Sequence, residues 1–357
     1  MIFRGASARI EDMATTMWLE HARCGWAAFT ARHAWARWVE KWGVSVSSLA
    51  FGVVTLLVFR RGIEYFPWFV GYLLLLWLAG VVCAEMRQAL AARGPRLLWL
   101  AMDYTVQSLF HGLLLFLLPI YYASTTLVSR NVGFLLLLVA AALLTAVDPW
   151  YRAIVARSRW VEVLLFGFGL FASLNVAFPL VGVRTTWALG LSGIVSLLAL
   201  TPVFHRGPRT SWWTALVYAG TGAVIVALLL WPVRRWIPPV PLQLTRATFA
   251  RSVFDFEPWQ PVSTISIDDL RGWGEMVAFT AVAAPAGLRE PIYHQWRREG
   301  KRVEKISLSP VRGGRPGGFR TYSRKAGLGA ELTGTWTVDV LTAHEQLIGR
   351  VRLIVTP

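Results

Sequence analysis

Long apolar segments recur along the first two thirds of the chain. A helix that crosses a membrane needs about 20 mostly apolar residues, because the hydrocarbon core cannot hydrogen-bond an exposed backbone. The segments that meet or approach this length are residues 44–59, 66–83, 97–121, 132–147, 160–183, 187–204 and 211–231. The pattern therefore predicts seven spans. The first and fourth segments have only 16 residues, so six spans remain an alternative if one of them is re-entrant or merely buried.

The pattern changes after residues 236–242, where three prolines prevent the last apolar helix from continuing and form a short, stiff linker. Beyond the linker, apolar and polar residues alternate with a period of two, most clearly in residues 334–340 and 350–355. Such alternation predicts half-buried strands. About seven short strands fit into this C-terminal part, which is typical of an immunoglobulin-like sandwich.

These patterns together predict a multi-domain protein. Residues 44–235 form an all-α polytopic membrane bundle of about seven transmembrane helices, and residues 243–357 form an all-β immunoglobulin-like sandwich. Residues 1–43 carry tryptophans such as Trp18 and Trp26 at helical spacing, near several arginines. This combination favours an amphipathic helix in the membrane interface, and a cytoplasmic helix that binds a partner is the alternative.

Composition and charge set the expected location of each part. The chain is 55% hydrophobic and only 16% charged, so most of it should lie in lipid. The connections on the side of the N-terminus carry 14 Lys and Arg residues, against six on the other side. Because basic loops are retained in the cytoplasm, we expect a multi-pass protein of the bacterial inner membrane with a cytoplasmic N-terminus and a periplasmic C-terminal domain. The net charge of +16 mostly reflects this asymmetry, so nucleic acid is not an expected partner.

A polar stripe interrupts the third apolar segment. Asp103, Gln107 and His111 are spaced by four residues, which places them on one face of a helix. Counting residues from the start of each span puts Asn175 of the fifth segment at the depth of His111, so these four residues could form one intramembrane polar site. Such a site could be a proton path, a ligand contact or a set of interhelical hydrogen bonds.

A second candidate site lies in the C-terminal domain. Arg320, Ser323 and Lys325, with His294, could bind phosphate or carboxylate, and a solvated basic rim is the alternative. We expect Trp296 to be a core residue, and a hydrogen-bonded structural histidine is the other reading of His294. Residues 289–325 carry 11 basic and three acidic residues. Near a membrane this excess favours anionic lipid headgroups, phosphorylated glycans or an acidic protein surface.

Motifs for common chemistries are absent from the sequence. The six histidines and two cysteines show no spacing typical of zinc ligands. There is no glycine loop ending in Gly-Lys-Ser/Thr and no Gly-x-Ser-x-Gly elbow. We therefore expect neither a metal nor a cofactor, and the sequence gives no support for an enzyme.

The C-terminal residues nevertheless carry an ordered set of motifs. These are His294-x-Trp296, Gly300, Arg320-x-x-Ser323-x-Lys325 and Gly334-x-Trp336-x-Val338. Their order over residues 243–355 resembles an uncharacterised bacterial family in which a multi-span membrane region precedes a C-terminal domain of unknown function. The resemblance implies the identity of the domain and no activity.

The expected function follows from the topology and from the basic segment. We expect an envelope binding, assembly or sensing protein, surrounded by membrane lipids. Its periplasmic sandwich would recognise an anionic envelope component, such as a glycan, or a periplasmic or membrane protein partner. The alternative is a transporter or an intramembrane enzyme that uses Asp103, Gln107 and His111.

Overall fold

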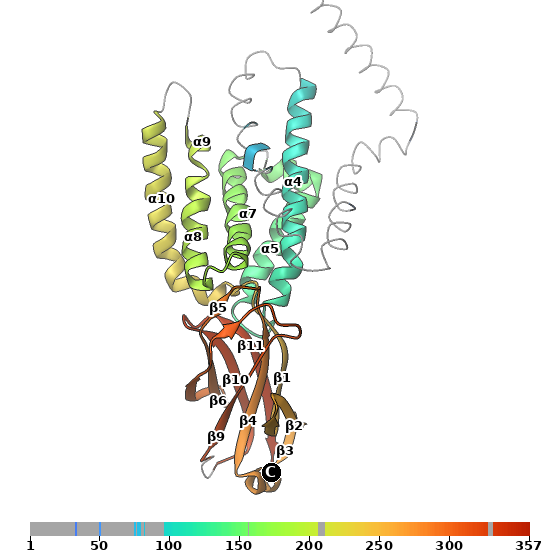
Figure 1. The fold of residues 1–357 in the computed structure, drawn as a ribbon. Coiled ribbons are helices and arrows are strands. Elements are labelled where there is room, and N and C mark those ends of the chain that lie inside the picture. Colours follow the sequence, from blue (N-terminus) through green and yellow to red (C-terminus); the bar gives the residue numbers. More distant parts are fainter. Residues whose placement is uncertain are drawn as a thin grey trace, which may run out of the picture.

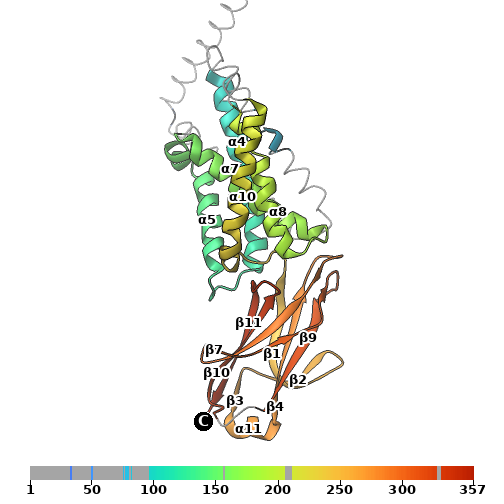
Figure 2. The ribbon, with the colours of Figure 1, turned by 90° about the vertical axis from the view of Figure 1, so that its left-hand side faces the viewer.

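The computed structural model describes residues 96–155, 157–205, 211–327 and 331–357, together with residues 33, 50, 75, 77–79 and 82. A helical part is followed by an all-β part, and the two stand end to end (Figure 1). The C-terminus lies at the end of the β part that is remote from the helices (Figure 2). The predicted segment 1–43 and the predicted spans 44–59 and 66–83 fall almost entirely outside the described residues.

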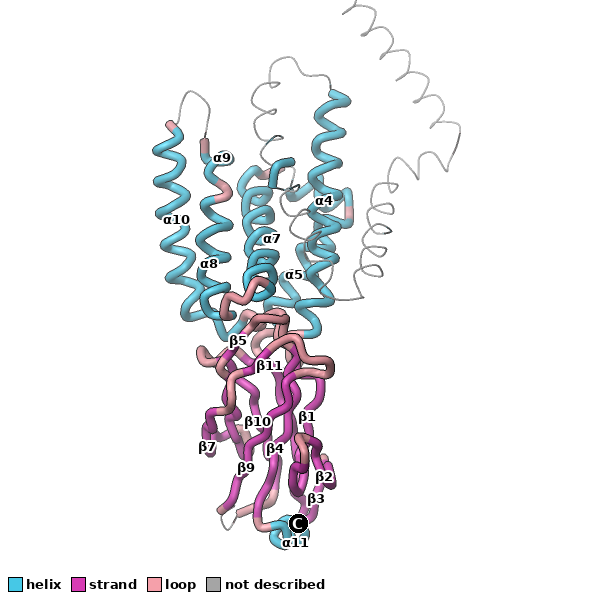
Figure 3. The backbone as a smooth tube through the Cα atoms, in the orientation of Figure 1, coloured by secondary structure: helices cyan, strands magenta, loops and turns pink. Residues whose placement is uncertain are grey.

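The helical part is a bundle in which α7 contacts both α4 and α8, and α8 contacts α10 (Figure 3). Its helices are α4 (Arg96–Ala123), α5 (Val132–Ala146), α6 (Asp148–Trp150), α7 (Arg159–Leu180), α8 (Thr185–Leu198), α9 (Thr201–Phe204) and α10 (Trp212–Val233). A π-helical turn, η2 (Tyr151–Val155), and a 3₁₀ turn, η4 (Arg234–Trp236), complete it.

Within the described residues, three helical segments are long and apolar enough to cross a membrane, namely Arg159–Leu180, Thr185–Phe204 and Trp212–Trp236. They indicate a membrane protein. Two further apolar helices, Gln107–Ala123 and Val132–Ala146, are shorter. The predicted count of seven spans is not supported. For α5 the reason is its 15 residues, which reach about 22 Å at about 1.5 Å per residue, less than the roughly 30 Å of a hydrocarbon core.

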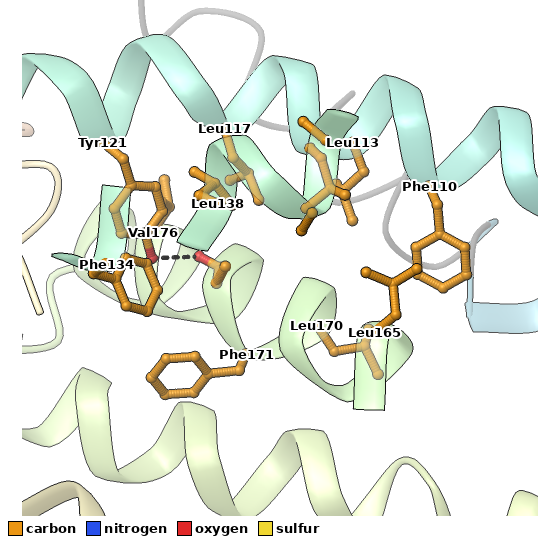
Figure 4. Packing of buried hydrophobic residues seen from close by; sticks show 14 of the residues in the cluster. Phe110, Leu113, Leu117, Tyr121, Phe134, Leu138, Leu165, Leu170, Phe171 and Val176 are labelled. Atoms are coloured by element: carbon orange, nitrogen blue, oxygen red, sulfur yellow. Dashed lines mark hydrogen bonds between the residues drawn. The ribbon is translucent and has the colours of Figure 1, made fainter. Parts of the chain in front are cut away.

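The centre of the bundle is built from large apolar side chains that recur every three or four residues along α4, so that they share one face. Figure 4 shows Phe110, Leu113, Leu117 and Tyr121 of α4 packed among side chains of α5 and α7. Phe110 lies edge-on to Phe166 of α7, with ring centroids 5.3 Å apart. These contacts fix the level of α4 relative to α7.

The β part consists of two main sheets. The first has the order β2-β1-β4-β9 and contains β1 (Gln243–Phe254), β2 (Glu257–Val262), β4 (Glu275–Ala283) and β9 (Phe319–Ala326). The second has the order β3-β11-β10-β6-β7 and contains β3 (Thr264–Ser266), β6 (Ile292–Arg298), β7 (Lys301–Ser307), β10 (Gly334–Thr342) and β11 (Leu347–Thr356). A separate ribbon joins β5 (Arg289–Glu290) to β8 (Val311–Arg312), and a short helix, α11 (Ile267–Trp273), precedes β4.

The core lies between the two main sheets. Phe249 and Met276 of the first sheet and Trp296 and Val338 of the second belong to one buried cluster. Trp296 is fully buried and lies edge-on to Phe249, with ring centroids 5.7 Å apart. The alternating pattern therefore predicted the all-β class and the core position of Trp296 correctly.

Most of the predicted linker 236–242 is buried between the two parts, and only Trp236 at its start is exposed. Ile237 and Val240 pack in the core of the bundle, whereas Leu242 packs in a core cluster of the sandwich. Three prolines limit the conformations of this segment. Because apolar side chains of one short segment enter both cores, the segment attaches the sandwich to the bundle.

Candidate functional site

Two polar residues of α4 face α5. Gln107 donates a hydrogen bond from Nε2 to the main-chain oxygen of Thr145 at 3.0 Å, and Nδ1 of His111 lies 3.4 Å from Thr145 Oγ1. All three side chains are buried. Asp103 also belongs to α4, but its side chain lies outside what the structure describes. The contacts of Gln107 and His111 join two helices, which is one of the roles expected for the polar stripe.

Asn175 does not meet His111. Its Nδ2 donates to the hydroxyl of Tyr121 at 3.2 Å. That hydroxyl donates to the main-chain oxygen of Ala172 at 3.0 Å, which is the bond drawn in Figure 4. Phe110, the residue before His111, packs instead against Phe166. Phe166 precedes Asn175 by nine positions in α7. Nine helical residues span about 13 Å. Counting depth from the start of each span failed because α4 and α7 begin at different levels.

In the sandwich, two of the four predicted ligand-binding residues lie side by side in the core. Nδ1 of His294 is 2.8 Å from Ser323 Oγ, and its Nε2 is 2.9 Å from Thr280 Oγ1. Ser323 Oγ also accepts a hydrogen bond from Nε1 of Trp296 at 3.0 Å. A neutral imidazole has one donor and one acceptor nitrogen, so both nitrogens of His294 are satisfied. The network connects β4 and β9 of one sheet with β6 of the other.

Burial decides what this network can do. His294 is fully buried, and burial lowers the pKa of its imidazole to about 3, so the ring is neutral near pH 7. A serine next to a histidine is also found in catalytic triads, where the histidine is the base that activates the serine nucleophile and a carboxylate orients the histidine. Here a hydroxyl, Thr280, occupies the position of an orienting carboxylate, and Ser323 is only 4% exposed. The geometry is that of a structural polar core. Its partners Thr280 and Trp296 were not among the predicted site residues.

The other two predicted ligand-binding residues lie elsewhere. Arg320 points to the opposite face of β9 from Ser323 and forms an ion pair with Glu257 at 2.6 Å. Lys325 forms an ion pair with Glu304 of β7 at 2.8 Å. The structure therefore does not bring Arg320 to His294 and Ser323. That any of these four residues binds an anion remains a prediction.

The basic residues of the segment 289–325 fall into two classes. Five are paired with carboxylates: Arg297 with Asp339, Arg298 with Glu331, Arg320 with Glu257, Arg324 with Glu275, and Lys325 with Glu304. The other six have no ion-pair partner in the described part of the chain: Arg289, Lys301, Arg302, Lys305, Arg312 and Arg315. The strands β6 and β9 therefore hold the cations that have a carboxylate partner, whereas β7 and the β5–β8 region hold the others. Two of the carboxylates are shared, because Glu257 also pairs with Arg246 and Asp339 with Arg350.

Three of these six cations lie together on β7. Lys301 and Arg302 are exposed, and Lys305 is half-buried beside the ring of Tyr293. We call Lys301, Arg302 and Lys305 the β7 cations. Their strand is the last in its sheet, and it begins at the end of β6 that is remote from the bundle. Lys301 and Arg302 are therefore open to solvent and to partners, and Lys305 is partly so.

The sandwich contacts the bundle through several hydrogen bonds. Nδ2 of Asn131 donates to the main-chain oxygen of Leu347 at 3.2 Å. Nε2 of Gln346 donates to the main-chain oxygen of Ile237 at 3.1 Å. Nε of Arg234 donates to the main-chain oxygen of His344 at 3.1 Å. Because they connect two separate segments of the bundle side, the α4–α5 connection and residues 234–237, with the same end of the sandwich, these bonds hold the sandwich end-on.

A buried carboxylate completes this contact. Oε2 of Glu290 accepts a hydrogen bond from the main-chain N–H of Thr185, in the first turn of α8, at 3.0 Å. A helix N-terminus favours a negative charge there. Burial raises the pKa of Glu290, and the bonds from Thr185 and the charge of Arg184 oppose this effect. Glu290 thus marks the point where α8 and the β5–β8 ribbon meet.

The described residues contain no group of three or more His, Cys, Asp or Glu side chains that could hold a metal ion.

Comparison with protein families gives two matches. Residues 24–276 match a family of unknown function, DUF5924, and residues 289–355 match a protein family of unknown function, DUF2914. The resemblance of the C-terminal motifs to a domain of unknown function behind a membrane region is thereby confirmed. No curated protein and no solved structure matches the chain. Since the first match covers more than half of the sequence, the chain belongs to the family of unknown function DUF5924.

Proposed function

We propose that this protein is anchored in the bacterial inner membrane and presents a binding domain in the periplasm. The helix connections and the segment before the linker on the sandwich side contain four arginines, Arg130, Arg184, Arg234 and Arg235. The starts of α4, α7 and α10 lie on the opposite side of the bundle. In the sequence, the stretches that lead into these three helices contain eight arginines, Arg87, Arg93, Arg96, Arg152, Arg157, Arg159, Arg206 and Arg209. The excess of arginine on that side favours its retention in the cytoplasm, which supports a periplasmic sandwich without any assumption about the total number of spans.

We infer further that the domain is an immunoglobulin-like sandwich. Strands β1, β4 and β9 follow the order of the A, B and E strands, and β11, β10, β6 and β7 follow that of G, F, C and C′. The short β3 runs parallel to β11. Trp296 on β6 occupies the place of the core tryptophan on the C strand of such domains. A fold of this type serves many functions, so the function has to be argued from its side chains.

The β7 cations are the observation that carries the proposal. Most other cations of the basic segment are neutralised within the sandwich, whereas Lys301, Arg302 and Lys305 are not paired with any carboxylate of the described residues. Exposed cations on a small area raise the local concentration of anionic partners. The proposed function is recognition of an anionic envelope component, such as a phosphorylated glycan, or of an acidic partner protein.

Lysines on an edge strand can also have a protective role, because charge on an edge prevents pairing with a strand of another molecule. Reversing the charge distinguishes this protective role from binding of an anionic partner. Glutamates at Lys301, Arg302 and Lys305 would still protect the edge, but they would repel an anionic partner.

The test is a binding measurement on the full-length protein in nanodiscs of phosphatidylcholine. The probes are a phosphorylated glycan fraction from bacterial envelopes and poly-glutamate. The variant Lys301→Glu/Arg302→Glu/Lys305→Glu should bind at least about tenfold more weakly than the unchanged protein. The matched control, Arg251→Glu/Arg271→Glu/Arg352→Glu, makes the same change of charge at exposed positions of the sandwich and should lose much less affinity. Equal losses in both variants would show non-specific attraction and refute the proposal.

The alternative function, transport or intramembrane catalysis, rests on His111. Its ring is fully buried, Nδ1 faces Thr145, and Nε2 has no hydrogen-bond partner among the residues that the structure describes. The change Asp103→Asn with His111→Ala should abolish transport and leave binding at the β7 cations intact. Loss of binding with unchanged folding would favour this alternative.

A further inference from the structure

A cavity of about 210 Å³ opens where the bundle meets the sandwich. Its lining residues are Arg184, Arg289, Pro291, Pro310 and Arg312. Arg184 belongs to the connection between α7 and α8, Arg289 to β5 and Arg312 to β8. Figure 1 shows β5 directly below this connection. We call Arg184, Arg289 and Arg312 the junction arginines.

The junction arginines concentrate positive charge that the protein does not neutralise. Arg289 and Arg312 are direct partners across the two-stranded ribbon, and like charges in that position repel each other. None of the three has an ion-pair partner within the described ranges. The nearby carboxylate of Glu290 is bonded to Thr185 and is not part of the lining, and it offsets at most one of the three charges. An anion in the cavity would relieve the repulsion.

The backbone next to the cavity is held by hydrogen bonds and close packing, which fixes the main-chain positions of Arg289 and Arg312. Gly313, next to Arg312, donates a hydrogen bond from its N–H to the main-chain oxygen of Leu288 at 3.1 Å. A Cβ atom on Gly313 would lie only 1.7 Å from the main-chain oxygen of Pro285, so only glycine permits this approach. Pro291 and Pro310 restrict the two strands of the lining further. A fixed backbone keeps these side chains within reach of one ligand, and binding then orders only the exposed side chains themselves.

The position of the cavity identifies the kind of anion. Arg184 lies between two segments that are long and apolar enough to cross a membrane, Arg159–Leu180 and Thr185–Phe204. A residue directly at the ends of two spans lies at the level of the lipid headgroups. Guanidinium groups bind phosphate with paired hydrogen bonds. The volume is below the roughly 300 Å³ at which pockets for whole drug-sized ligands begin, and it suits a headgroup phosphate.

We propose that the junction arginines bind the phosphate of an anionic phospholipid in the leaflet on the sandwich side. One headgroup then contacts Arg184 of the bundle and Arg289 and Arg312 of the sandwich at once. The bound lipid stabilises the end-on arrangement, because it binds the docked sandwich better than a detached one. This inference is independent of the proposed function, since the β7 cations belong to another strand and Lys301 and Arg302 lie at its end remote from the bundle.

The test is native mass spectrometry of the full-length protein in detergent, with added phosphatidylglycerol, phosphatidylcholine or inorganic phosphate. The unchanged protein should retain phosphatidylglycerol at least about tenfold better than phosphatidylcholine. The variant Arg184→Gln/Arg289→Gln/Arg312→Gln should lose this preference. The matched control, Lys301→Gln/Arg302→Gln/Lys305→Gln, removes the same number of charges from the β7 cations and should keep it.

Three outcomes would overturn the inference. One is equal retention of phosphatidylglycerol by the junction variant and by the control. Another is equal retention of phosphatidylcholine and phosphatidylglycerol by the unchanged protein. The third is displacement of the lipid by millimolar inorganic phosphate, which would indicate a site for the free anion.

The single change Arg312→Lys provides a second test, and it disturbs folding less than the triple variant does. It keeps the charge but removes the paired hydrogen bonds, and it should weaken retention about threefold or more.

Discussion

The bundle and the sandwich both bury polar side chains, but they satisfy them in different ways. In the bundle, Gln107 and Tyr121 each donate one bond to a main-chain oxygen of a neighbouring helix. In the sandwich, His294, Ser323 and Trp296 belong to one side-chain network that joins the two sheets. One hydrogen bond between helices contributes little to the stability of a membrane bundle. In a connected network, removal of one side chain leaves another buried polar group without a hydrogen-bond partner. Substitution of a polar residue in the sandwich core should therefore reduce the free energy of unfolding more than substitution of one in the bundle.

The largest effect should come from dividing the sandwich at the boundary between the two family matches. Residues 289–355 contain the whole second match but lack β1 and β4. Without them, β9 has no strand to pair with, and the core loses Phe249 and Met276. This segment alone should show no cooperative unfolding, whereas residues 240–357 should unfold in one thermal transition followed by circular dichroism. A cooperative transition in residues 289–355 would contradict the account of a single core.

The next largest effect concerns the polar network. Ser323→Ala leaves Nδ1 of His294 and Nε1 of Trp296 without a partner, so the free energy of unfolding should fall by about 3 kcal/mol. Urea denaturation of residues 240–357 measures this change. Ser252→Ala is the matched control, because the buried hydroxyl of Ser252 has no hydrogen-bond partner among the described residues, and it should cost little. Similar losses for both serines would mean that the network adds no special stability.

A smaller effect depends on pH. Burial lowers the pKa of His294 from 6.5 to about 3, so the unfolded chain takes up a proton below pH 6.5 that the folded domain does not. The free energy of unfolding should therefore decrease by about 2 kcal/mol from pH 7 to pH 5 through this group. His294→Gln should lack this part of the decrease, while the contribution of the carboxyl groups remains. Identical pH profiles for both proteins would show that His294 is protonated in the folded state.

The smallest effect should be seen in the bundle. Gln107→Leu removes one bond between α4 and α5 and should destabilise the bundle by only about 0.6 kcal/mol. Unfolding of the full-length protein in detergent by increasing amounts of sodium dodecyl sulfate provides the measurement. A loss of several kcal/mol would remove the contrast between the two regions.

The sequence predicted burial correctly where the periodicity of a single strand decides whether a side chain faces the core. The period of two placed Trp296 and Val338 in the core, because alternate side chains of a strand face opposite sides. The pattern could not show that Ser323 bonds to His294, since these residues meet only when the two sheets pack. It also misplaced Asn175, because the level of one helix relative to another is set by packing contacts such as that between Phe110 and Phe166.

Charge on the surface was predictable in amount but not in distribution. The sequence revealed the excess of 11 basic over three acidic residues in the segment 289–325. It did not reveal that Arg320 pairs with Glu257, which is 63 positions away, whereas Arg289 and Arg312 face each other. Partners of this kind are brought together by strand pairing. The exposed charges that remain unpaired are therefore better candidates for binding than the motif residues.

The central claim is that the buried polar residues support the fold and that the unpaired cations of β7 make the binding surface. The most direct test measures binding of the envelope glycan fraction to full-length protein in phosphatidylcholine nanodiscs, for the unchanged chain, for Lys301→Glu/Arg302→Glu/Lys305→Glu, and for His294→Gln. The account predicts that the first variant binds at least about tenfold more weakly and that His294→Gln, while folded, binds as the unchanged protein does. Loss of binding in folded His294→Gln, with binding preserved in the β7 variant, would contradict it.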